Sequence, residues 1–320
     1  MFWQIVLLIV GFVLLIKGAD VFVDGASSTA ANFKVSKMLI GLTIIAFGTS
    51  APEFAVSMQA LASGSTDMVL GNVIGSNIIN ILLILGMAAL IKPIRIKANT
   101  IRKELPICLL ISVLLVVLFL DIQISGGSAN IITRSDGIAI ILFFLVFLYY
   151  LIALARKNRK DRKAEKPRFK LPVSLLLVAL GIAGIIIGSQ LIVNSATEIA
   201  TTLGVSERVI AMTVIALGTS LPELVTTITA ARKGEAELAV GNIIGSNIFN
   251  ICIVLGVPVA LFGTVTPGSF QVVDLVMLVV SAVVLFIFAK TQRKISRREG
   301  ALMLLAFAAY YAVVLIGTGI

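Results

Sequence analysis

Long apolar runs separated by short polar breaks make up most of this 320-residue chain. Ten of these runs come close to or exceed the roughly 20 residues that an α-helix needs to cross the hydrocarbon core of a bilayer. The alternating pattern of a membrane β-strand is missing from the sequence. We therefore predict an all-α polytopic membrane protein with ten transmembrane helices. The expected spans are 2–23, 37–62, 68–91, 104–121, 131–155, 171–194, 206–231, 238–262, 270–290 and 299–319.

The chain contains an internal repeat at a fixed offset of 170 residues. The correspondence is densest in two motifs, each of which occurs twice. Ten of 21 positions are identical between the copies of the first motif, and eleven of 16 between the copies of the second. The copies of the first motif are IGLTIIAFGTSAPEFAVSMQA (40–60) and IAMTVIALGTSLPELVTTITA (210–230), and those of the second are GNVIGSNIINILLILG (71–86) and GNIIGSNIFNICIVLG (241–256).

This repeat determines the expected topology. Each half holds five expected spans, and because five is odd, the second half must cross the membrane in the opposite direction to the first. We therefore predict two inverted five-helix repeats, 1–155 and 171–320, whose most similar parts lie at 37–91 and 206–262. The segment 156–170 is the expected linker between them.

The distribution of charge is consistent with a membrane protein. Hydrophobic residues make up 59% of the chain and charged residues 13%, with a net charge of +10. If the amino terminus lies outside the cell, 23 of the 26 Lys and Arg residues fall on the cytosolic side, as the positive-inside rule requires. We predict both termini outside, a cytosolic linker over 156–170 that could touch anionic lipids, and a location in the cell membrane. A nucleic-acid partner is not needed to explain the charge.

Composition also limits the chemistry of this protein. The chain has no histidine, so the commonest general base is missing, and no nucleophile with a matching base is evident. We expect a transporter without a cofactor and not an enzyme. Cys108 and Cys252 are isolated within apolar runs, which favours buried apolar side chains over a disulfide or a metal site.

Two acidic residues lie deep inside expected spans. Glu53 and Glu223 each follow about 16 residues of their span, where an ionised side chain costs at least about 2.5–3.5 kcal/mol without a partner. Lys17 is the basic residue nearest to such depth, and it can pair with Asp20. A bound cation is therefore the expected partner, and oxygen ligands without Cys or His favour calcium, magnesium, manganese or sodium.

A proline precedes each of these glutamates. Pro52 and Pro222 have no N–H, so each removes one helical hydrogen bond and displaces the carbonyl four residues earlier, at Gly48 and Gly218. A single proline in a membrane helix is often a harmless kink. Its occurrence twice, beside an intramembrane Glu and at one offset, favours two broken helices that expose oxygens to a cation.

The second motif has two interpretations. Glycines four residues apart are typical of close helix packing, and Ser and Asn can form hydrogen bonds between helices. A Ser and an Asn four residues apart also place two neutral oxygen ligands on one helix face. Both roles can coexist. The residues concerned are Gly71, Gly75, Ser76, Asn77 and Asn80 in the first copy and Gly241, Gly245, Ser246, Asn247 and Asn250 in the second.

Together the motifs, GTSxPE followed by GNxxGSNxxN in inverted duplicate, resemble the α-repeats of sodium/calcium exchangers in the cation/calcium antiporter superfamily, especially prokaryotic ones. The resemblance covers 11–86 and 181–256. It implies ten transmembrane helices, alternating access, and export of calcium driven by inward sodium.

The resemblance also implies a set of ion ligands. Glu53 and Glu223 would bind both calcium and sodium, with oxygens of Thr49 and Thr219 close by. The other implied ligands are the carbonyls of Ala46 and Ala216, the hydroxyls of Ser50, Ser220, Ser76 and Ser246, and Asn80 and Asn250 near the centre.

Some alternatives stay open from the residues alone. Potassium-dependent relatives carry Asp where this chain has Asn250, so we do not expect a potassium requirement. A proton/calcium antiporter is the nearest alternative, because Glu can carry protons, and a cation channel is a weaker one. The number of ions bound together and the oligomeric state are left undetermined.

We place the transport movement in the first and sixth spans. Both are rich in glycine, which could let them slide over a fixed core. The glycines concerned are Gly11, Gly18, Gly181, Gly184 and Gly188.

Overall fold

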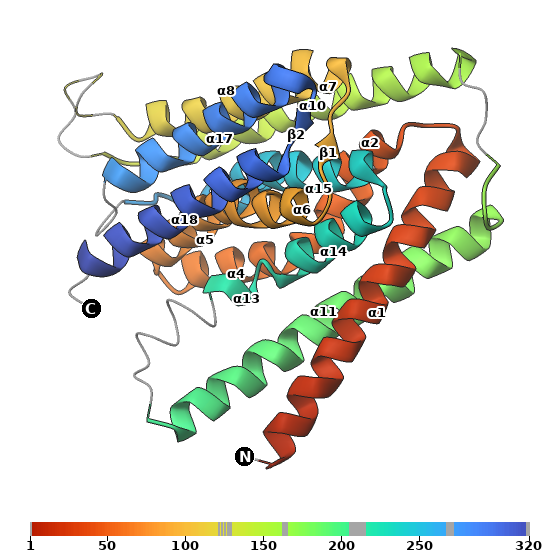
Figure 1. Ribbon diagram of the computed structural model, residues 1–320. Helices are drawn as coiled ribbons and strands as arrows, with labels where there is room; N and C mark the ends of the chain where they lie inside the picture. The colour runs from red at the N-terminus through yellow and green to blue at the C-terminus, as the bar shows by residue number, and fades with distance from the viewer. Residues whose placement is uncertain are drawn as a thin grey trace. The chain divides into compact units, whose positions relative to one another are not determined.

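A computed structural model describes residues 2–120, 122, 124, 126, 130–161, 166–204, 216–266 and 272–317. In these parts the chain is helical, apart from one two-stranded ribbon and one isolated bridge between Ile132 and Val265 (Figure 1). The helices form two compact units, each of which takes residues from both halves of the sequence. Unit 1 comprises Met1–Pro52 and Ala153–Asn242, and unit 2 comprises Glu53–Ile152 and Ile243–Ile320.

The expected all-helical membrane architecture is confirmed. Within the described residues, six helices are long and apolar enough to cross a membrane, and a pair bent by 47° gives a seventh candidate. Parts of four expected spans lie outside the described residues, so the count of ten stays a prediction. The six helices are Phe2–Phe33, Thr66–Ile91, Arg134–Arg156, Leu171–Thr202, Ala236–Phe262 and Val273–Gln292, and the bent pair is Lys37–Thr49 with Ala51–Ala62.

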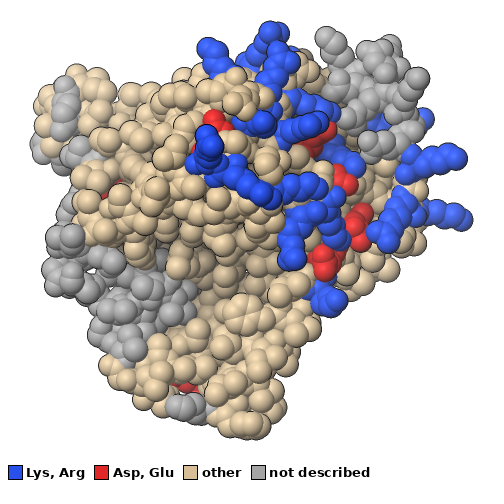
Figure 2. All heavy atoms as spheres, in the orientation of Figure 1, with Lys and Arg blue, Asp and Glu red and all other residues tan. Residues whose placement is uncertain are grey.

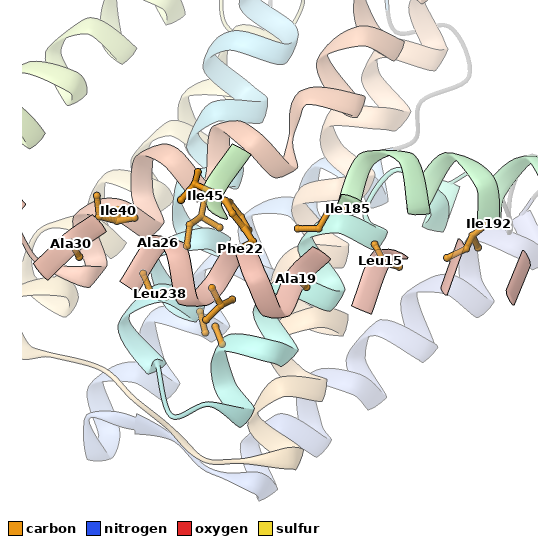
Figure 3. Close-up of a cluster of buried hydrophobic side chains, with 14 residues drawn as sticks. Leu15, Ala19, Phe22, Ala26, Ala30, Ile40, Ile45, Ile185, Ile192 and Leu238 are labelled. Atoms are coloured by element: carbon orange, nitrogen blue, oxygen red, sulfur yellow. The ribbon is translucent and has the colours of Figure 1, made fainter. Parts of the chain in front are cut away.

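Unit 1 is built around two long helices, α1 and α11 (Figure 1). Their buried side chains, including Phe22 and Ile185, form a hydrophobic core with residues of α2, η1, α14 and α15 (Figure 3). The elements of unit 1 are α1 (Phe2–Phe33), α2 (Lys37–Ile40), the π-helical turn η1 (Gly41–Ile45), α3 (Ala46–Thr49), α11 (Leu171–Thr202), α13 (Ala216–Gly218), α14 (Leu221–Arg232) and the first half of α15 (Ala236–Phe249).

Helices α1 and α11 contact each other backbone to backbone. A Cβ at Gly18 would lie 2.8 Å from the Ile185 nitrogen, and one at Gly188 would lie 2.6 Å from the Leu15 nitrogen, so small residues are needed at both points. Residue 15 faces 188 while 18 faces 185, so the helices are antiparallel. We expected these glycines to face a fixed core over which the two helices slide. This expectation is wrong, because the glycines pack the two helices against each other.

The helix breaks expected at the two prolines are confirmed. In the first copy of the motif α3 ends at Thr49, Ser50 forms a turn, and α4 begins at Ala51. In the second copy α13 ends at Gly218 and α14 begins at Leu221. Each proline therefore lies in the first turn of a new helix, where its missing N–H costs no hydrogen bond.

Unit 2 is a helical bundle with a short antiparallel ribbon, in which β1 comes from the first half of the sequence and β2 from the second. Ile94 pairs with Ile295, and both are buried, whereas Arg95 is exposed. Lys and Arg side chains gather over the end at which Figure 1 places this ribbon (Figure 2). The elements of unit 2 are α4 (Ala51–Ala62) from Glu53 onward, α5 (Thr66–Ile78), η2 (Ile79–Leu85), α6 (Gly86–Ile91), β1 (Ile94–Arg95), α7 (Ala98–Arg102), α8 (Glu104–Leu118), α10 (Arg134–Asp161) up to Ile152, the second half of α15, η4 (Asn250–Leu255), α16 (Gly256–Phe262), α17 (Val272–Gln292), β2 (Lys294–Ile295) and α18 (Arg297–Gly317).

Close helix packing, expected for the glycines four residues apart in the second motif, is confirmed at Gly241. A Cβ at Gly241 would lie 2.8 Å from the Met38 carbonyl oxygen. At Gly71 and Gly75 an added Cβ would have no heavy atom within 4 Å in the part of the chain that the structure describes. Gly71 corresponds to Gly241 at the offset of 170, and Met38 corresponds to Arg208. The residue equivalent to the contact of Gly241 therefore lies outside the described residues.

Candidate functional site

The two copies of the first motif meet inside unit 1. Ser50 of the first copy donates a hydrogen bond from Oγ to Glu223 Oε1 of the second copy, at 2.9 Å. Both residues are 0% exposed. Ser50 forms the turn before α4, and Glu223 lies in the first turn of α14, where the helix dipole favours a negative charge. The two helix breaks thus bring a hydroxyl and a carboxylate from opposite halves of the sequence together.

Thr49 adds further oxygens on the same side of the break. Its hydroxyl lies 3.1 Å from the Ile45 carbonyl, 3.4 Å from the Ala46 carbonyl and 3.1 Å from Asn242 Oδ1. The Ala46 carbonyl also accepts from the backbone N–H of Ser50 at 3.0 Å. A carbonyl oxygen has two lone pairs, so the Ala46 oxygen retains capacity for a second partner.

In the second copy of the motif the expected oxygens are only partly available. Ser220 is buried and Thr219 half-buried in the turn before α14, and Ala216 begins α13. The Gly218 carbonyl, which the following proline was expected to release, accepts a hydrogen bond from Ser189 Oγ at 3.0 Å. A side chain of α11 therefore forms a hydrogen bond with one of the carbonyl oxygens that we expected to be exposed to a cation.

Glu53 belongs to unit 2 and is 1% exposed in the first turn of α4. Asn72 of α5 donates from Nδ2 to the Glu53 carbonyl oxygen at 2.8 Å and to Ser57 Oγ at 2.9 Å. This side chain fixes the first two turns of α4 against α5. The backbone that carries Glu53 is therefore held in place by the second motif of the same repeat.

The second motif contributes a buried cluster of amides and hydroxyls to unit 2. Asn80 donates from Nδ2 to Asn247 Oδ1 at 3.0 Å, and Asn247 donates from Nδ2 to the Asn77 carbonyl at 3.2 Å. Among the described residues, Asn80 Oδ1, Ser246 Oγ and both polar atoms of the Asn250 side chain have no hydrogen-bond partner. Buried polar atoms are normally satisfied, so these oxygens are suited to a cation. The predicted ligands Ser76, Asn80, Ser246 and Asn250 are all buried here.

Two π-helical turns coincide with this cluster. Asn80 lies in η2, and Asn250 begins η4. A π-helical turn adds a residue to the helical repeat and is frequent at functional sites. The sequence pattern did not predict it.

The predicted ligands are thus divided between the units. Ala46, Thr49, Ser50, Ala216, Thr219, Ser220 and Glu223 belong to unit 1, and Glu53, Ser76, Asn80, Ser246 and Asn250 belong to unit 2. In the described ranges no group of three or more His, Cys, Asp or Glu side chains could hold a metal ion.

Two asparagines of the second motif were missed as site residues. Asn72 holds Glu53, as described above, and Asn242 contacts Thr49 and also donates from Nδ2 to Thr227 Oγ1 at 3.0 Å. The available signal was the Gly-Asn dipeptide that begins both copies of the motif. An amide repeated at one offset inside an apolar span indicates a constrained role, just as the repeated glutamates do.

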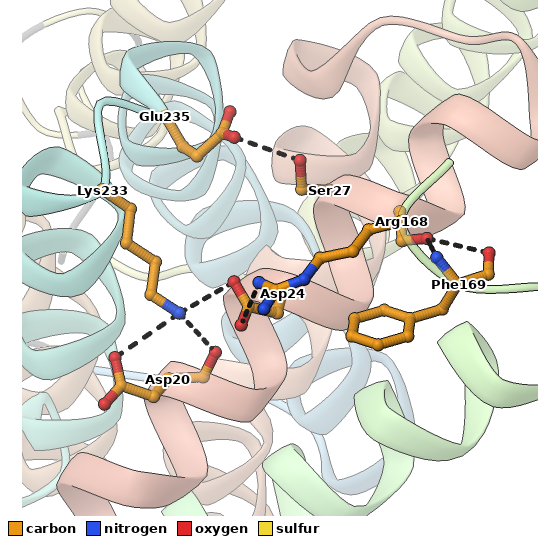
Figure 4. Close-up of polar contacts among 8 residues, drawn as sticks. Asp20, Asp24, Ser27, Arg168, Phe169, Lys233 and Glu235 are labelled. Atoms are coloured by element: carbon orange, nitrogen blue, oxygen red, sulfur yellow. Dashed lines mark hydrogen bonds and ion pairs between the residues drawn. The ribbon is translucent and has the colours of Figure 1, made fainter. Parts of the chain in front are cut away.

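At another point in unit 1, α1 contacts the turn between α14 and α15 through charged groups (Figure 4). Lys233 Nζ lies 2.8 Å from Asp24 Oδ1 and 3.5 Å from Asp20 Oδ1. The expectation that Asp20 pairs with Lys17 is therefore wrong. Asp20 instead contacts a lysine of the other repeat.

A carboxylate in the turn between α14 and α15 extends this network of charged groups. Glu235 lies 2.9 Å from Lys37 Nζ and accepts a hydrogen bond from Ser27 at 3.1 Å. On the other side of α1, Arg168 lies 3.2 Å from Asp24 (Figure 4). These charged groups line a cavity of about 500 Å³ and connect α1 to three other chain segments.

Comparison with known proteins assigns the chain to a family. The sequence profile described as sodium/calcium exchanger protein matches residues 3–153 and 173–316. This chain belongs to the sodium/calcium exchanger family. The exchanger is 35% identical over 344 residues to the sodium/calcium exchanger MaX1 of Methanosarcina acetivorans, covering 96% of this chain and 97% of MaX1. It is 40% identical over 312 residues to the putative antiporter CaxA of Alkalimonas amylolytica, covering 95% and 96%.

Further relatives agree with this assignment. The exchanger is 37% identical over 317 residues to the inner membrane protein YrbG of Escherichia coli strain K12, covering 96% of this chain and 95% of YrbG. A solved structure of the sodium-calcium exchanger NCX_Mj, soaked with Na⁺ and Sr²⁺, matches with a TM-score of 0.83 and 33% identity, covering 98% of this chain and 97% of NCX_Mj. The exchanger is therefore a multi-pass membrane protein of a transporter family whose ions are sodium and calcium.

Proposed function

We propose that this exchanger is a secondary active antiporter that exchanges sodium for calcium across the cell membrane by alternating access. The contact between Ser50 and Glu223 is the observation that carries the proposal. It joins the two copies of the motif at helix breaks, where a buried carboxylate and nearby hydroxyls can accept a dehydrated cation. The similarity to MaX1 and NCX_Mj, both exchangers of sodium and calcium, supports the choice of ions.

Glu53 and Glu223 are the proposed ligands for both ions. Each is buried, and each lies in the first turn of a helix that begins at a break. Two carboxylates balance one calcium ion, which takes about 6–8 oxygens in all. The further proposed ligands are oxygens of Ala46, Thr49, Ser50, Ser76 and Asn80 from the first repeat and of Ala216, Thr219, Ser220, Ser246 and Asn250 from the second.

One sodium site is proposed within unit 1. The Ala46 carbonyl, the hydroxyls of Thr49 and Ser50, and the carboxylate of Glu223 are linked by the short contacts described above. This set combines one negative charge with several neutral oxygens, which suits a hard monovalent cation.

Sodium coupling is favoured over proton coupling by the neutral groups. A coupled proton needs a titratable acceptor, whereas sodium can use hydroxyl, amide and carbonyl oxygens. The buried oxygens of Ser246 and Asn250, which lack a partner among the described residues, suit sodium. Because position 250 is Asn, a potassium requirement is not expected. The proton/calcium antiporter remains the second candidate, supported by the acidic side chains of Glu53 and Glu223.

The proposed topology has ten transmembrane helices in two inverted repeats, 1–155 and 171–320. The antiparallel contact of α1 with α11 supports it, because these helices correspond at the offset of 170. The proposed orientation has both termini outside and a cytosolic linker over 156–170, where basic residues can touch anionic lipids.

We further propose that α1 and α11 move together between the two access states. Their backbone contacts at the glycines make relative sliding of the two helices difficult. The moving body is therefore the pair of helices, not either helix alone.

Calcium-45 uptake into vesicles containing the purified protein tests this function. Uptake is measured under outward gradients of sodium, potassium and protons in turn. The proposal expects uptake with the sodium gradient and none with the other two. Uptake driven only by protons would establish the second candidate, and uptake without any gradient would indicate a channel.

A further inference from the structure

Asn242 is fully buried and connects the two repeats inside unit 1. Its Oδ1 accepts a hydrogen bond from Thr49 of the first repeat at 3.1 Å, and its Nδ2 donates to Thr227 of the second repeat at 3.0 Å. Thr227 lies one turn after Glu223 on α14. One amide therefore ties the residue before the first helix break to the helix that carries the buried carboxylate.

The Thr49 hydroxyl has one proton but more than one acceptor within reach. A threonine hydroxyl has one proton, and in a helix it normally goes to the carbonyl four residues earlier. Here Ile45 O and Asn242 Oδ1 lie at the same distance, 3.1 Å, so the amide competes for that proton. When the proton goes to Asn242, the lone pairs of Thr49 Oγ1 and the nearby carbonyl of Ala46 are left to a cation.

The contact with Thr227 is matched to the orientation of the amide at Thr49. The two ends of an asparagine side chain differ only in whether they accept or donate. Because Nδ2 donates to Thr227, the oxygen and not the NH₂ group faces the Thr49 hydroxyl. An NH₂ group at that place would donate to Thr49 Oγ1 and use the lone pair that a cation needs.

We propose that Asn242 is a positioning residue for sodium, which orients the Thr49 hydroxyl so that its oxygen faces the ion. The inference rests on the proposed sodium site in unit 1. Asn242 itself is not a ligand in this scheme. Its counterpart Asn72 holds the backbone of Glu53, a proposed ligand for both ions, so the two asparagines should differ in which ion they affect.

The test compares Asn242→Leu, which has a similar shape but no amide, with the wild type in reconstituted vesicles. Sodium-driven calcium-45 uptake is measured against sodium concentration and, separately, against calcium concentration. We expect the sodium concentration for half-maximal uptake to rise about five- to tenfold, as for one buried hydrogen bond. The calcium dependence should change far less. Asn72→Leu should shift both dependences together.

A double mutant distinguishes positioning from a general effect on packing. In a Thr49→Val background the hydroxyl is gone, so Asn242→Leu should cause no further change in the sodium dependence. A further shift as large as in the wild-type background would overturn the proposal. So would equal shifts for sodium and calcium in Asn242→Leu alone.

Thr227→Val provides a second route if Asn242→Leu does not fold. It leaves the amide in place but removes the acceptor of Nδ2, so a smaller rise in the sodium requirement is expected. An unchanged sodium dependence in this variant would contradict the proposal. The proposed function is judged separately: if wild-type uptake is not driven by sodium, the function itself is wrong, whereas sodium-driven uptake with an unaffected Asn242→Leu overturns only the role of Asn242.

Discussion

Replacing Ser50 by alanine removes one hydrogen bond from a buried carboxylate. The bond joins Ser50 Oγ to Glu223 Oε1 at 2.9 Å, and both residues are 0% exposed. Hydrogen bonds to charged groups contribute about 1.5–3 kcal/mol, roughly twice as much as neutral ones. We therefore expect Ser50→Ala to lower the stability of the ion-free protein by about 1.5–3 kcal/mol.

Bound ions should reduce this loss. A cation at Glu223 supplies the carboxylate with an electrostatic partner, so the hydroxyl of Ser50 matters less once the site is filled. Thermal unfolding of the purified protein is measured without ions, with saturating calcium and with saturating sodium. Ser63→Ala is the matched control, because Ser63 is exposed and donates only to the nearby Ala60 carbonyl.

Two outcomes would refute this reasoning. If Ser50→Ala is as stable as Ser63→Ala in ion-free buffer, the bond to Glu223 contributes nothing to stability. If the loss is the same with and without ions, the cation and Ser50 do not serve the same carboxylate.

Three further predictions concern packing, charge and selectivity. Gly18→Leu should prevent α1 from packing on α11 and abolish exchange, whereas Gly75→Ala should be tolerated because an added Cβ meets no described atom within 4 Å. Size-exclusion profiles and sodium-driven calcium-45 uptake of the two variants test both expectations. Asp24→Asn removes partly exposed ion pairs with Lys233 and Arg168, so it should cost less than about 1 kcal/mol of stability. This loss should shrink at high salt because salt screens exposed charges, which thermal unfolding at low and high salt checks. Asn250→Asp adds a third carboxylate to the proposed ion ligands, so its uptake should gain a dependence on potassium that wild-type uptake lacks.

Local features of the site could be predicted from the sequence. Pro52 and Pro222 determine where helices must break, because a proline fits the first turn of a helix and not its interior. The structure has both breaks. The burial of Cys108 and Cys252 as free thiols likewise follows from the apolar runs around them.

Contacts between distant segments could not be predicted in the same way. Apolar periodicity defines which residues form a helix but not which helix a glycine faces, so the contact of Gly18 with α11 was missed. The partner of the Gly218 carbonyl was missed for the same reason, because Ser189 lies on another helix. The ribbon that pairs Ile94 with Ile295 consists of only two residues per strand, too few for a period-two pattern to appear.

Partners of buried amides are equally hidden from the sequence. A repeated Asn at positions 72 and 242 indicates a constraint, and both copies donate to a hydroxyl at equivalent positions, Ser57 and Thr227. Their other contacts differ: Asn72 holds the backbone of Glu53, and Asn242 contacts the hydroxyl of Thr49. Sequence identity between the repeats therefore indicates that both positions are constrained, but it does not show all of the contacts that each one makes.

The central claim is that two buried carboxylates, one from each repeat, bind the exchanged ions. The most direct measurement is sodium-driven calcium-45 uptake by Glu53→Gln and by Glu223→Gln, each of which keeps the shape of the side chain and removes its charge. Both variants should insert and purify like the wild type and take up no calcium under a sodium gradient. Wild-type uptake by both variants would contradict the account.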